Sequence, residues 1–244
     1  MATVIGVTGL AFEARIAADR CTHAICIGNG RTLPESLVSA IARDCCGLVS
    51  FGVAGGLSPD LSAGTCIVGS MIVSETIKLA TDRDWSQALL QLIPDAIHGA
   101  IAGATTIVAH PDRLHMSTGA LAVDNESRVV ASVAAARRLP MAAVRVIMDP
   151  AGRQLPAAAL ASVRKNGTID PAALVRAIVG QPGELPMLLR TALDARIGFA
   201  ALLRCRQLLG PGLGLPALQA REPERGPSIE IPIYGLDGRY LKRS

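Results

Sequence analysis

Aromatic residues are scarce in this chain: three Phe, two Tyr and one Trp occur among 244 residues. Half of the residues are apolar, so a core of useful size has to be built from aliphatic side chains. The net charge is only +4 and is scattered along the chain. No basic block with interleaved aromatic residues occurs, which argues against a nucleic acid as the main partner.

Three other sequence signals are also missing. The six cysteines form no C-x-x-C pair, and most lie in apolar runs, which favours buried reduced thiols over a zinc site or a disulfide framework. The N-terminus leads directly into a strand pattern without a basic segment or a cleavage motif, so no secretory signal is expected. No charge-free apolar run reaches the roughly 20 residues that a membrane-spanning helix needs. We therefore expect a cytoplasmic protein, and we expect no bound metal, because His110 and His115 lack metal-ligand spacing.

Apolar runs and helical patterns alternate through the first two thirds of the chain. Strands are predicted at residues 3–8, 24–27, 47–53, 66–73, 104–108 and 141–149. Helices are predicted at residues 12–19, 34–44, 86–92 and 127–138. This alternation predicts a three-layer α/β/α fold with a mostly parallel mixed central sheet.

Beyond about residue 165 the pattern is helical only, with helices predicted at 171–179 and 185–209. We expect one domain over residues 1–219, in which 165–214 form a helical C-terminal region. Residues 220–244 are polar and are expected to form a poorly ordered tail. The apolar face of the second helix is expected to cover the sheet or to form a subunit interface in a homo-oligomer. The alternative is a channel wall for a lipid tail or a peripheral membrane contact.

Two carboxylates, Glu126 and Asp149, are predicted to meet at one edge of the sheet. The intervening helix of about 13 residues runs about 20 Å outward. A following strand of seven residues runs about 23 Å back. Open α/β sheets bind ligands at this edge. Each residue also has an ordinary alternative, because Asp149 precedes Pro150 and suits a turn, and Glu126 suits the first turn of a helix.

Other chemistry-bearing residues follow neighbouring strands. Gly9 ends the first strand and Glu13 comes one helical turn later, although an acid on an amphipathic helix is more often solvated. The third strand ends in Gly55-Gly56, where backbone N–H groups could approach an anion or a sugar closely. Cleavage of an N-glycosidic bond needs these parts: an acid for the leaving base, a carboxylate for the ribose, and a site for water or phosphate.

Three ordered segments resemble the nucleoside phosphorylase and nucleosidase superfamily. They are FGVAGGL at residues 51–57, AVDNES at 122–127 and VRVIMD at 144–149. A narrower resemblance is to the hopanoid-associated phosphorylases, in GLAFEARIA at 9–17, TGALAVD at 118–124, DPAGRQLP at 149–156 and the helical C-terminal third. This resemblance implies release of adenine from adenosylhopane in hopanoid side-chain biosynthesis. The alternatives are a nucleosidase for a simpler adenine nucleoside or thioadenosine, and a nucleoside-binding protein without turnover.

The resemblance also implies roles for individual residues. Asp149 would contact purine N7 as the general acid, and Glu13 would activate water. Glu126 and Asn125 would bind the ribose, although Asn125 stands where the family usually has Met. No cofactor is implied, and phosphate is an alternative co-substrate to water. The partner would be a small nucleoside, with a lipid-linked one preferred.

The same resemblance implies the remaining walls of the site. Gly9, Ala54 and Gly55 would line the phosphate or water site, and Met148 and Phe51 would line the base pocket. Val53 replaces a small polar residue of the glycine motif, which weakens the case for a tight phosphate site. Basic phosphate ligands are not obvious either, since Arg15 and Arg31 qualify by position alone.

Overall fold

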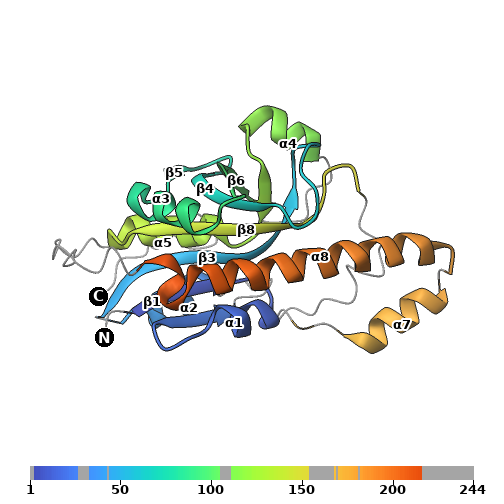
Figure 1. Cartoon of the computed structure of the whole chain (residues 1–244), viewed down its shortest axis with the longest axis horizontal. Helices are drawn as coiled ribbons and strands as arrows, with labels where there is room; N and C mark the ends of the chain where they lie inside the picture. The colour runs from blue at the N-terminus through green and yellow to red at the C-terminus, as the bar shows by residue number, and fades with distance from the viewer. Residues whose placement is uncertain are drawn as a thin grey trace, which may run out of the picture.

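The computed structural model describes residues 3–26, 33–42, 44–104, 111–153, 168, 170–180 and 182–215. Strands and helices alternate from the N-terminus to Asp149 (Figure 1). The elements are β1 (Thr3–Thr8), α1 (Ala11–Ala17), β2 (Thr22–Cys26), α2 (Leu33–Ala40), β3 (Cys45–Gly56), β4 (Cys66–Val73), β5 (Lys78–Ala80), α3 (Arg83–Leu92), β6 (Ile97–Gly103), α4 (Pro111–Thr118), β7 (Ala122–Asp124), α5 (Ser127–Arg137) and β8 (Met141–Asp149). The C-terminal part is helical, with α7 (Pro171–Gly180), η1 (Pro182–Glu184), α8 (Leu185–Leu209) and η2 (Pro211–Gly214).

The strands form one mixed sheet in which β3 holds the central place. Five of the eight described strand pairings are parallel. The first half of β3 pairs with β1, and its last two residues pair with β7. The pairings β3–β8, β8–β4, β4–β6, β6–β7 and β7–β3 close into a ring, so this part of the sheet curls on itself.

The register between β3 and β8 changes just before the end of both strands. Residues Leu48 to Ala54 pair one for one with Met141 to Ile147. The next pair is Gly55 with Asp149, so Met148 is the extra residue of a bulge. A bulge changes the direction in which the following side chains point. Asp149 therefore leaves the regular alternation of β8 at the point where the strand ends.

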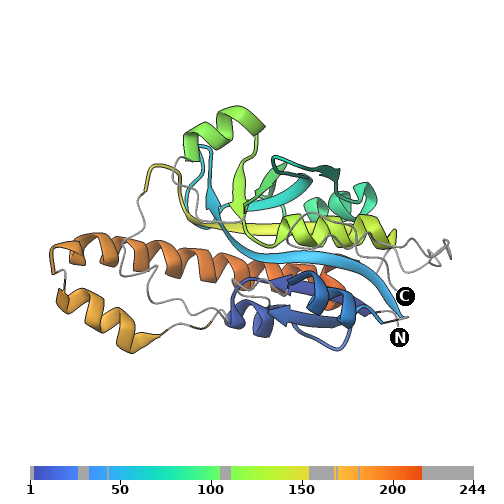
Figure 2. The same ribbon diagram turned by 180° about the vertical axis from the view of Figure 1, so that it is seen from behind.

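Helices cover both faces of the sheet, which confirms the predicted three-layer α/β/α fold (Figures 1 and 2). Neighbouring strand residues point to opposite faces. In β3, Leu48 lies in a core cluster that includes residues of α2 and α5. Val49 lies in a second cluster that includes residues of α1, α3 and α8. The core is largely aliphatic, as the composition requires.

Trp85 anchors the C-terminal segment to the sheet. Asp82 caps α3 by accepting a hydrogen bond from the backbone N–H of Trp85 at 2.9 Å. The indole is fully buried, and its Nε1–H donates to the carbonyl oxygen of Leu213 at 3.1 Å. One side chain therefore joins α3 to η2.

The structure contains a strand, β6 (Ile97–Gly103), that the sequence did not predict. Of the strand predicted at 104–108, Ala104 lies outside β6 and residues 105–108 fall outside the described residues. Glycines made β6 look unfavourable as a strand in the sequence. A Cβ at Gly99 would collide with Leu121, and one at Gly103 with Arg128. The glycines therefore allow the chain around β7 and α5 to approach β6 closely.

Helix α8 has a packed half and a projecting half. At a rise of about 1.5 Å per residue, its 25 residues span about 38 Å. The buried residues of α8 are Asp194, Gly198, Leu202, Cys205 and Leu209. The N-terminal half extends beyond the sheet beside α7 (Figures 1 and 2). None of the described helices is long and apolar enough to cross a membrane. The tail predicted at 220–244 lies outside the described residues.

All six cysteines are free thiols. Cys45, Cys66 and Cys205 are buried, and Cys21, Cys26 and Cys46 are partly buried. Burial raises the pKa of the Cys45 and Cys46 thiols, so these two stay protonated and apolar in character.

Replacement of Trp85 by Ala is expected to lower the free energy of unfolding by about 3–5 kcal/mol, because it opens a cavity and leaves the carbonyl of Leu213 without its donor. Urea unfolding followed by circular dichroism measures the change. Leu92→Ala on the same helix is the control, since Leu92 is 39% exposed and should cost less than about 1 kcal/mol. Equal losses in the two variants would contradict the anchoring role of Trp85.

Candidate functional site

A pocket of about 190 Å³ opens at the carboxyl ends of β1, β3 and β8. Its lining comes from four separate segments of the chain: Gly9, Leu10, Glu13, Val53, Ala54, Gly55, Val123, Asp124, Asn125, Glu126 and Asp149. Seven of the nine predicted site residues are among them. The helix-out, strand-back geometry therefore brings Glu126 and Asp149 to one cavity, although they are 23 positions apart in sequence.

The two residues predicted for the base pocket, Met148 and Phe51, do not line this cavity. Phe51 is fully buried in the core cluster on the α8 side of the sheet. Met148 packs against α8, where a Cβ at Gly198 would lie 3.4 Å from its Cα. The sequence motif placed both beside the site, but the alternation of side chains along β3 and β8 turns them toward α8. The geometry thus gives neither residue a place against a base in this pocket.

Glu13 is buried and is held by backbone donors, so the solvated alternative is wrong. Its Oε2 accepts hydrogen bonds from the N–H groups of Gly9 at 3.0 Å and Leu10 at 2.8 Å. Its Oε1 accepts one from the N–H of Val53 at 2.7 Å. Burial raises its pKa, although Arg145 and these backbone donors act in the opposite direction. Glu13 therefore fixes the turn before α1 against the end of β3.

The glycines at the strand ends make room for carboxylates. A Cβ at Gly9 would lie 2.5 Å from Oε1 of Glu126. A Cβ at Gly52 would lie 2.5 Å from Oε1 of Glu13 and 2.8 Å from Nη1 of Arg145. Larger side chains at these two positions would push the charged groups apart. Glycine at these two positions therefore allows the backbone to lie close to the protein's own carboxylates.

Arg145 is the centre of the charged network below the pocket. Its guanidinium is fully buried, and Nε lies 2.5 Å from Oδ2 of Asp124 in an ion pair. Its Nη2 lies 3.1 Å from Oε2 of Glu126 and donates to Oγ of Ser50 at 2.5 Å. Its Nη1 donates to the carbonyl oxygen of Val53 at 3.3 Å. One cation thus joins the end of β3 to the segment between β7 and α5.

Ser127 joins this network to the start of α5. Its N–H donates to Oδ1 of Asp124 at 3.0 Å, and its hydroxyl lies within hydrogen-bonding distance of Oδ2 of Asp124 and of Oγ of Ser50. Glu126 is the N-cap residue immediately before, so its position is fixed by this anchor. Sequence reasoning missed Arg145, Asp124, Ser50 and Ser127. The available signal was an arginine in the middle of an otherwise apolar strand.

Two carboxyls of the pocket have pKa values near neutrality. Burial raises the pKa of Glu126 to about 7; Arg145 lowers it, whereas Asp124 and Glu13 raise it. Burial raises the pKa of Asp149 to about 6. Groups that titrate close to pH 7 can both hold and release protons in a reaction, which makes these two candidates for acid–base chemistry.

The pocket is acidic. Four carboxylates line it, from Glu13, Asp124, Glu126 and Asp149, and no basic side chain is among the described lining residues. Arg145 lies outside the lining and is paired with two of these acids. Among the residues described, no group of His, Cys, Asp and Glu could hold a metal ion. The arrangement favours a neutral or developing positive charge in the pocket over a phosphate dianion.

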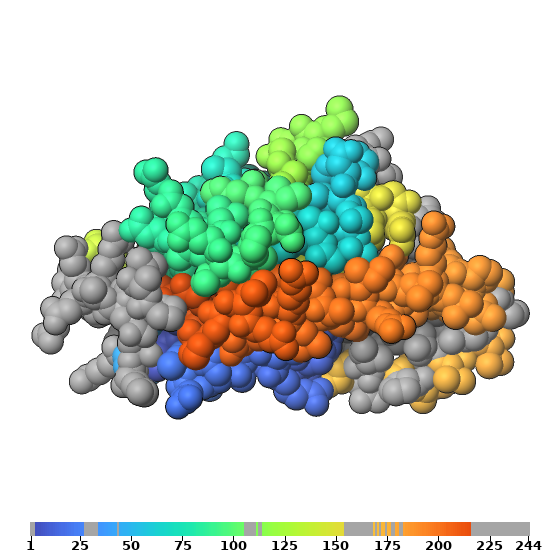
Figure 3. Space-filling model, viewed as in Figure 1, coloured from blue at the N-terminus to red at the C-terminus, as the bar shows by residue number. Residues whose placement is uncertain are grey.

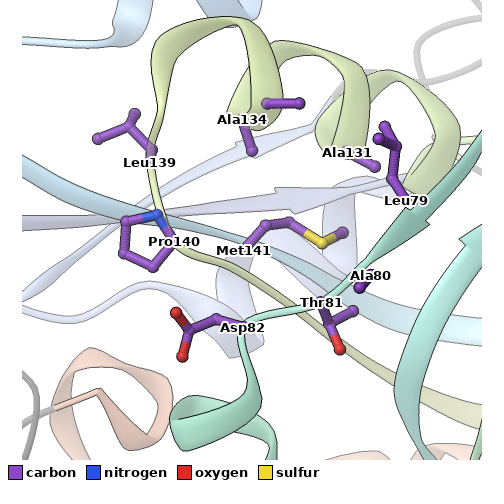
Figure 4. Close-up of a pocket in the computed structure, with 10 residues that line it drawn as sticks. Leu79, Ala80, Thr81, Asp82, Ala131, Ala134, Leu139, Pro140 and Met141 are labelled. Atoms are coloured by element: carbon purple, nitrogen blue, oxygen red, sulfur yellow. The ribbon is translucent and has the colours of Figure 1, made fainter. Parts of the chain in front are cut away.

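A second pocket, of about 220 Å³, lies at the opposite end of β8 (Figure 4). Small and apolar side chains make most of its wall, including Ala131, Ala134 and Leu139. Its one carboxylate among the lining residues is Asp82, which caps α3. This pocket offers no set of groups comparable to the acids around Asp149.

The curled sheet, the helices on both faces and the acid-lined strand ends define an α/β protein with a buried carboxylate site at the carboxyl edge of the sheet. The profile of the phosphorylase superfamily matches residues 36–180, which is more than half of the chain. The chain belongs to the phosphorylase superfamily, and this confirms the superfamily and the enzyme class that its motifs predict. The narrower resemblance to hopanoid-associated phosphorylases remains a prediction.

Solved structures share the fold at low sequence identity. The 5'-methylthioadenosine/S-adenosylhomocysteine nucleosidase of Helicobacter pylori aligns with a TM-score of 0.58 and 14% identity, over 85% of this chain and 96% of that chain. The corresponding nucleosidase of Colwellia psychrerythraea, in complex with adenine, aligns with a TM-score of 0.56 and 16% identity, over 74% and 96%. Futalosine hydrolase of Helicobacter pylori aligns with a TM-score of 0.53 and 17% identity, over 74% and 99%. Comparison with curated proteins finds no match.

Arg145→Met is expected to lower the free energy of unfolding by about 3–5 kcal/mol, because it leaves buried carboxylates without their cation. The loss should be larger at pH 8 than at pH 5. At pH 5 Glu126, with a pKa of about 7, is already protonated, whereas at pH 8 the unpaired acids must stay charged in the interior. Urea unfolding at both pH values measures this.

The control is Arg137→Met, which alters an exposed arginine at the end of α5 and should change stability by less than about 0.5 kcal/mol. A loss in Arg145→Met that does not depend on pH would argue against a charge-neutralising role.

Proposed function

We propose that this enzyme cleaves the N-ribosidic bond of an adenosyl compound and releases adenine. The observation that carries the proposal is that Glu126 and Asp149 line one cavity and have pKa values of about 7 and about 6. One carboxyl can protonate the leaving base while the other binds the sugar. The adenine complex of the Colwellia psychrerythraea nucleosidase, which shares the fold, supports adenine as the base.

In this mechanism Asp149 donates its proton to N7 as the bond between C1′ and N9 of the nucleoside breaks. Glu126 accepts hydrogen bonds from the ribose hydroxyls and stabilises the positive charge that develops on the sugar. Asn125, which is exposed at the pocket wall, is a second contact for the ribose. Arg145 holds Glu126 in place from below and keeps part of its population ionised.

Water is the nucleophile that the charge of the pocket favours. A phosphate dianion would enter a lining with four carboxylates and no described basic side chain. Arg15 is exposed on α1, and Arg31 lies outside the described residues. A water molecule can instead hydrogen-bond to the Glu13 carboxylate, which has lone pairs left after its three backbone donors. The water oxygen then bonds to C1′, and its proton replaces the one that Asp149 has lost.

The preferred substrate is adenosylhopane, and the place of the reaction is hopanoid side-chain biosynthesis. The motifs shared with hopanoid-associated phosphorylases support this choice. The exposed apolar residues of α7 and α8 agree with a substrate that carries a lipid tail. We further infer a homo-oligomer in the cytoplasm that contacts the membrane peripherally.

Two alternatives have their own support. A simpler adenine nucleoside or thioadenosine fits the names of the structures that share the fold. A nucleoside-binding protein without turnover fits the departures from the family at Val53 and Asn125, and at Met148, where the superfamily often has Ser. A panel of adenosylhopane, adenosine and methylthioadenosine separates the three, because only an enzyme releases free adenine.

Adenine release is expected to proceed at the same rate with and without inorganic phosphate, and to yield a free ribosyl product. Chromatography of the base and mass spectrometry of the sugar product measure both. A rate that requires phosphate, with a sugar phosphate as the product, would show phosphorolysis. If every compound binds and none releases adenine, only the alternative of a nucleoside-binding protein without turnover remains.

Asp149→Asn should lower kcat by about 10² or more, because a positioned acid contributes about 10²–10⁴ in rate. In the wild type, kcat/KM should be highest between pH 6 and 7. It falls below that range as Glu126 is protonated, and above it as Asp149 loses its proton.

In Asp149→Asn, kcat/KM should no longer decline above pH 7, because that decline is caused by the loss of the Asp149 proton. Asp60→Asn, at an exposed acid, is the control and should keep the wild-type profile. Wild-type turnover in Asp149→Asn would exclude the acid role.

A further inference from the structure

The projecting half of α8 exposes a row of large apolar side chains. Leu185, Leu189, Leu193 and Ile197 follow each other at intervals of four residues, with exposed fractions between 45% and 61%. No residue of α8 before Asp194 is buried. On α7, Val175 and Val179 are also exposed. Monomeric proteins rarely leave such contiguous apolar residues uncovered without a function.

These side chains share one side of the helix. Steps of four residues turn by about 40° around an α-helix, so the row from Leu185 to Ile197 winds over about 120°. Figures 1 and 2 show this half of α8 and α7 side by side, beyond the strands. Figure 3 shows α8 as a continuous ridge across one face of the molecule. A flat partner could therefore reach the row along its length.

The charges on this side of α8 have one sign. Arg190, Arg196 and Arg204 are exposed. At 100° per residue Arg196 and Arg204 fall within the sector of the apolar row, and Arg190 lies about 20° beyond its edge. The helix contains a single acid, Asp194, which is buried and paired with Arg153. Arg176 on α7 is exposed as well. Two copies joined face to face through this side would bring like charges together, whereas an anionic surface would match both the arginines and the leucines.

We propose that α7 and the exposed side of α8 dock on an anionic lipid surface. The apolar row enters the boundary between headgroups and acyl chains, and the arginines contact the lipid phosphates. The association is peripheral, since none of the described helices could cross a bilayer. Docking rests on these surface residues and not on the proposed reaction.

One consequence does rest on the proposed function. Helix α8 contacts the end of β8, where Gly198 packs on Met148, and the turn that follows the strand, where Asp194 pairs with Arg153. The docking surface therefore begins next to the strand end that carries Asp149. A docked enzyme would hold its pocket close to the membrane, where a lipid-linked adenosyl compound resides.

Flotation of the full chain with vesicles tests the proposal, and no substrate is present, so its outcome is independent of catalysis. We expect the protein to float with vesicles of phosphatidylcholine mixed with phosphatidylglycerol, and much less with phosphatidylcholine alone. The double variant Leu189→Gln and Leu193→Gln should bind the mixed vesicles at least about 10-fold more weakly. The double variant Arg190→Gln and Arg196→Gln should lose the preference for anionic vesicles and its sensitivity to salt.

Met116→Gln is the matched control, because Met116 on α4 is 86% exposed and lies outside the proposed surface. It should bind like the wild type, and circular dichroism should show all variants folded. Light scattering tests the alternative that this surface binds a second copy of the chain. Absence of flotation, or flotation unchanged by the leucine changes, overturns the proposal. So does an oligomer that the leucine changes dissociate, if the protein never binds vesicles.

Discussion

The site depends on the neutralisation of buried acids by one buried arginine. Arg145 contacts Asp124 and Glu126 directly, and its charge also acts on Glu13. Without this cation, carboxylates from α1, the end of β7 and the start of α5 could not share one interior region. The arginine stands on β8, the strand that closes the ring between β3 and β4. The same strand therefore closes the sheet and brings the buried arginine to the site.

Incomplete neutralisation gives the pocket its acid–base character. Burial raises the pKa of Glu126, and Arg145 offsets this only in part, because Asp124 and Glu13 add negative charge around it. Asp149 has no such cation, and burial alone raises its pKa. Two carboxyls that titrate near pH 7 at different places in one cavity are suited to two different roles. Burial raises both pKa values, and Glu126 lies above Asp149 although Arg145 lowers its pKa, because the neighbouring acids Asp124 and Glu13 raise it further.

The features that depend on the direction and length of chain segments could be predicted from the sequence. A helix out and a strand back are enough to bring Glu126 and Asp149 to the same edge, and the alternation of elements predicts the layers. Sequence reasoning did not reach the features that depend on which side of a strand a residue faces. Arg145, at the fourth position before Asp149, turns toward the acids, and Met148 turns toward α8 by the regular alternation of the strand, whereas the bulge changes the direction of Asp149. A one-residue change of register cannot be read from composition or motif spacing.

Helix α8 has one part that packs on the sheet and one part that is exposed. From Asp194 onward its buried residues complete the core above β3 and β8, and before Asp194 it has none. The buried part of α8 begins where the helix meets Met148 and Arg153, next to the end of the strand that carries Asp149. The first two turns of the helix contain no buried residue, so they contribute little to covering the sheet. Their exposed leucines and arginines are the features on which the proposed docking to an anionic surface rests.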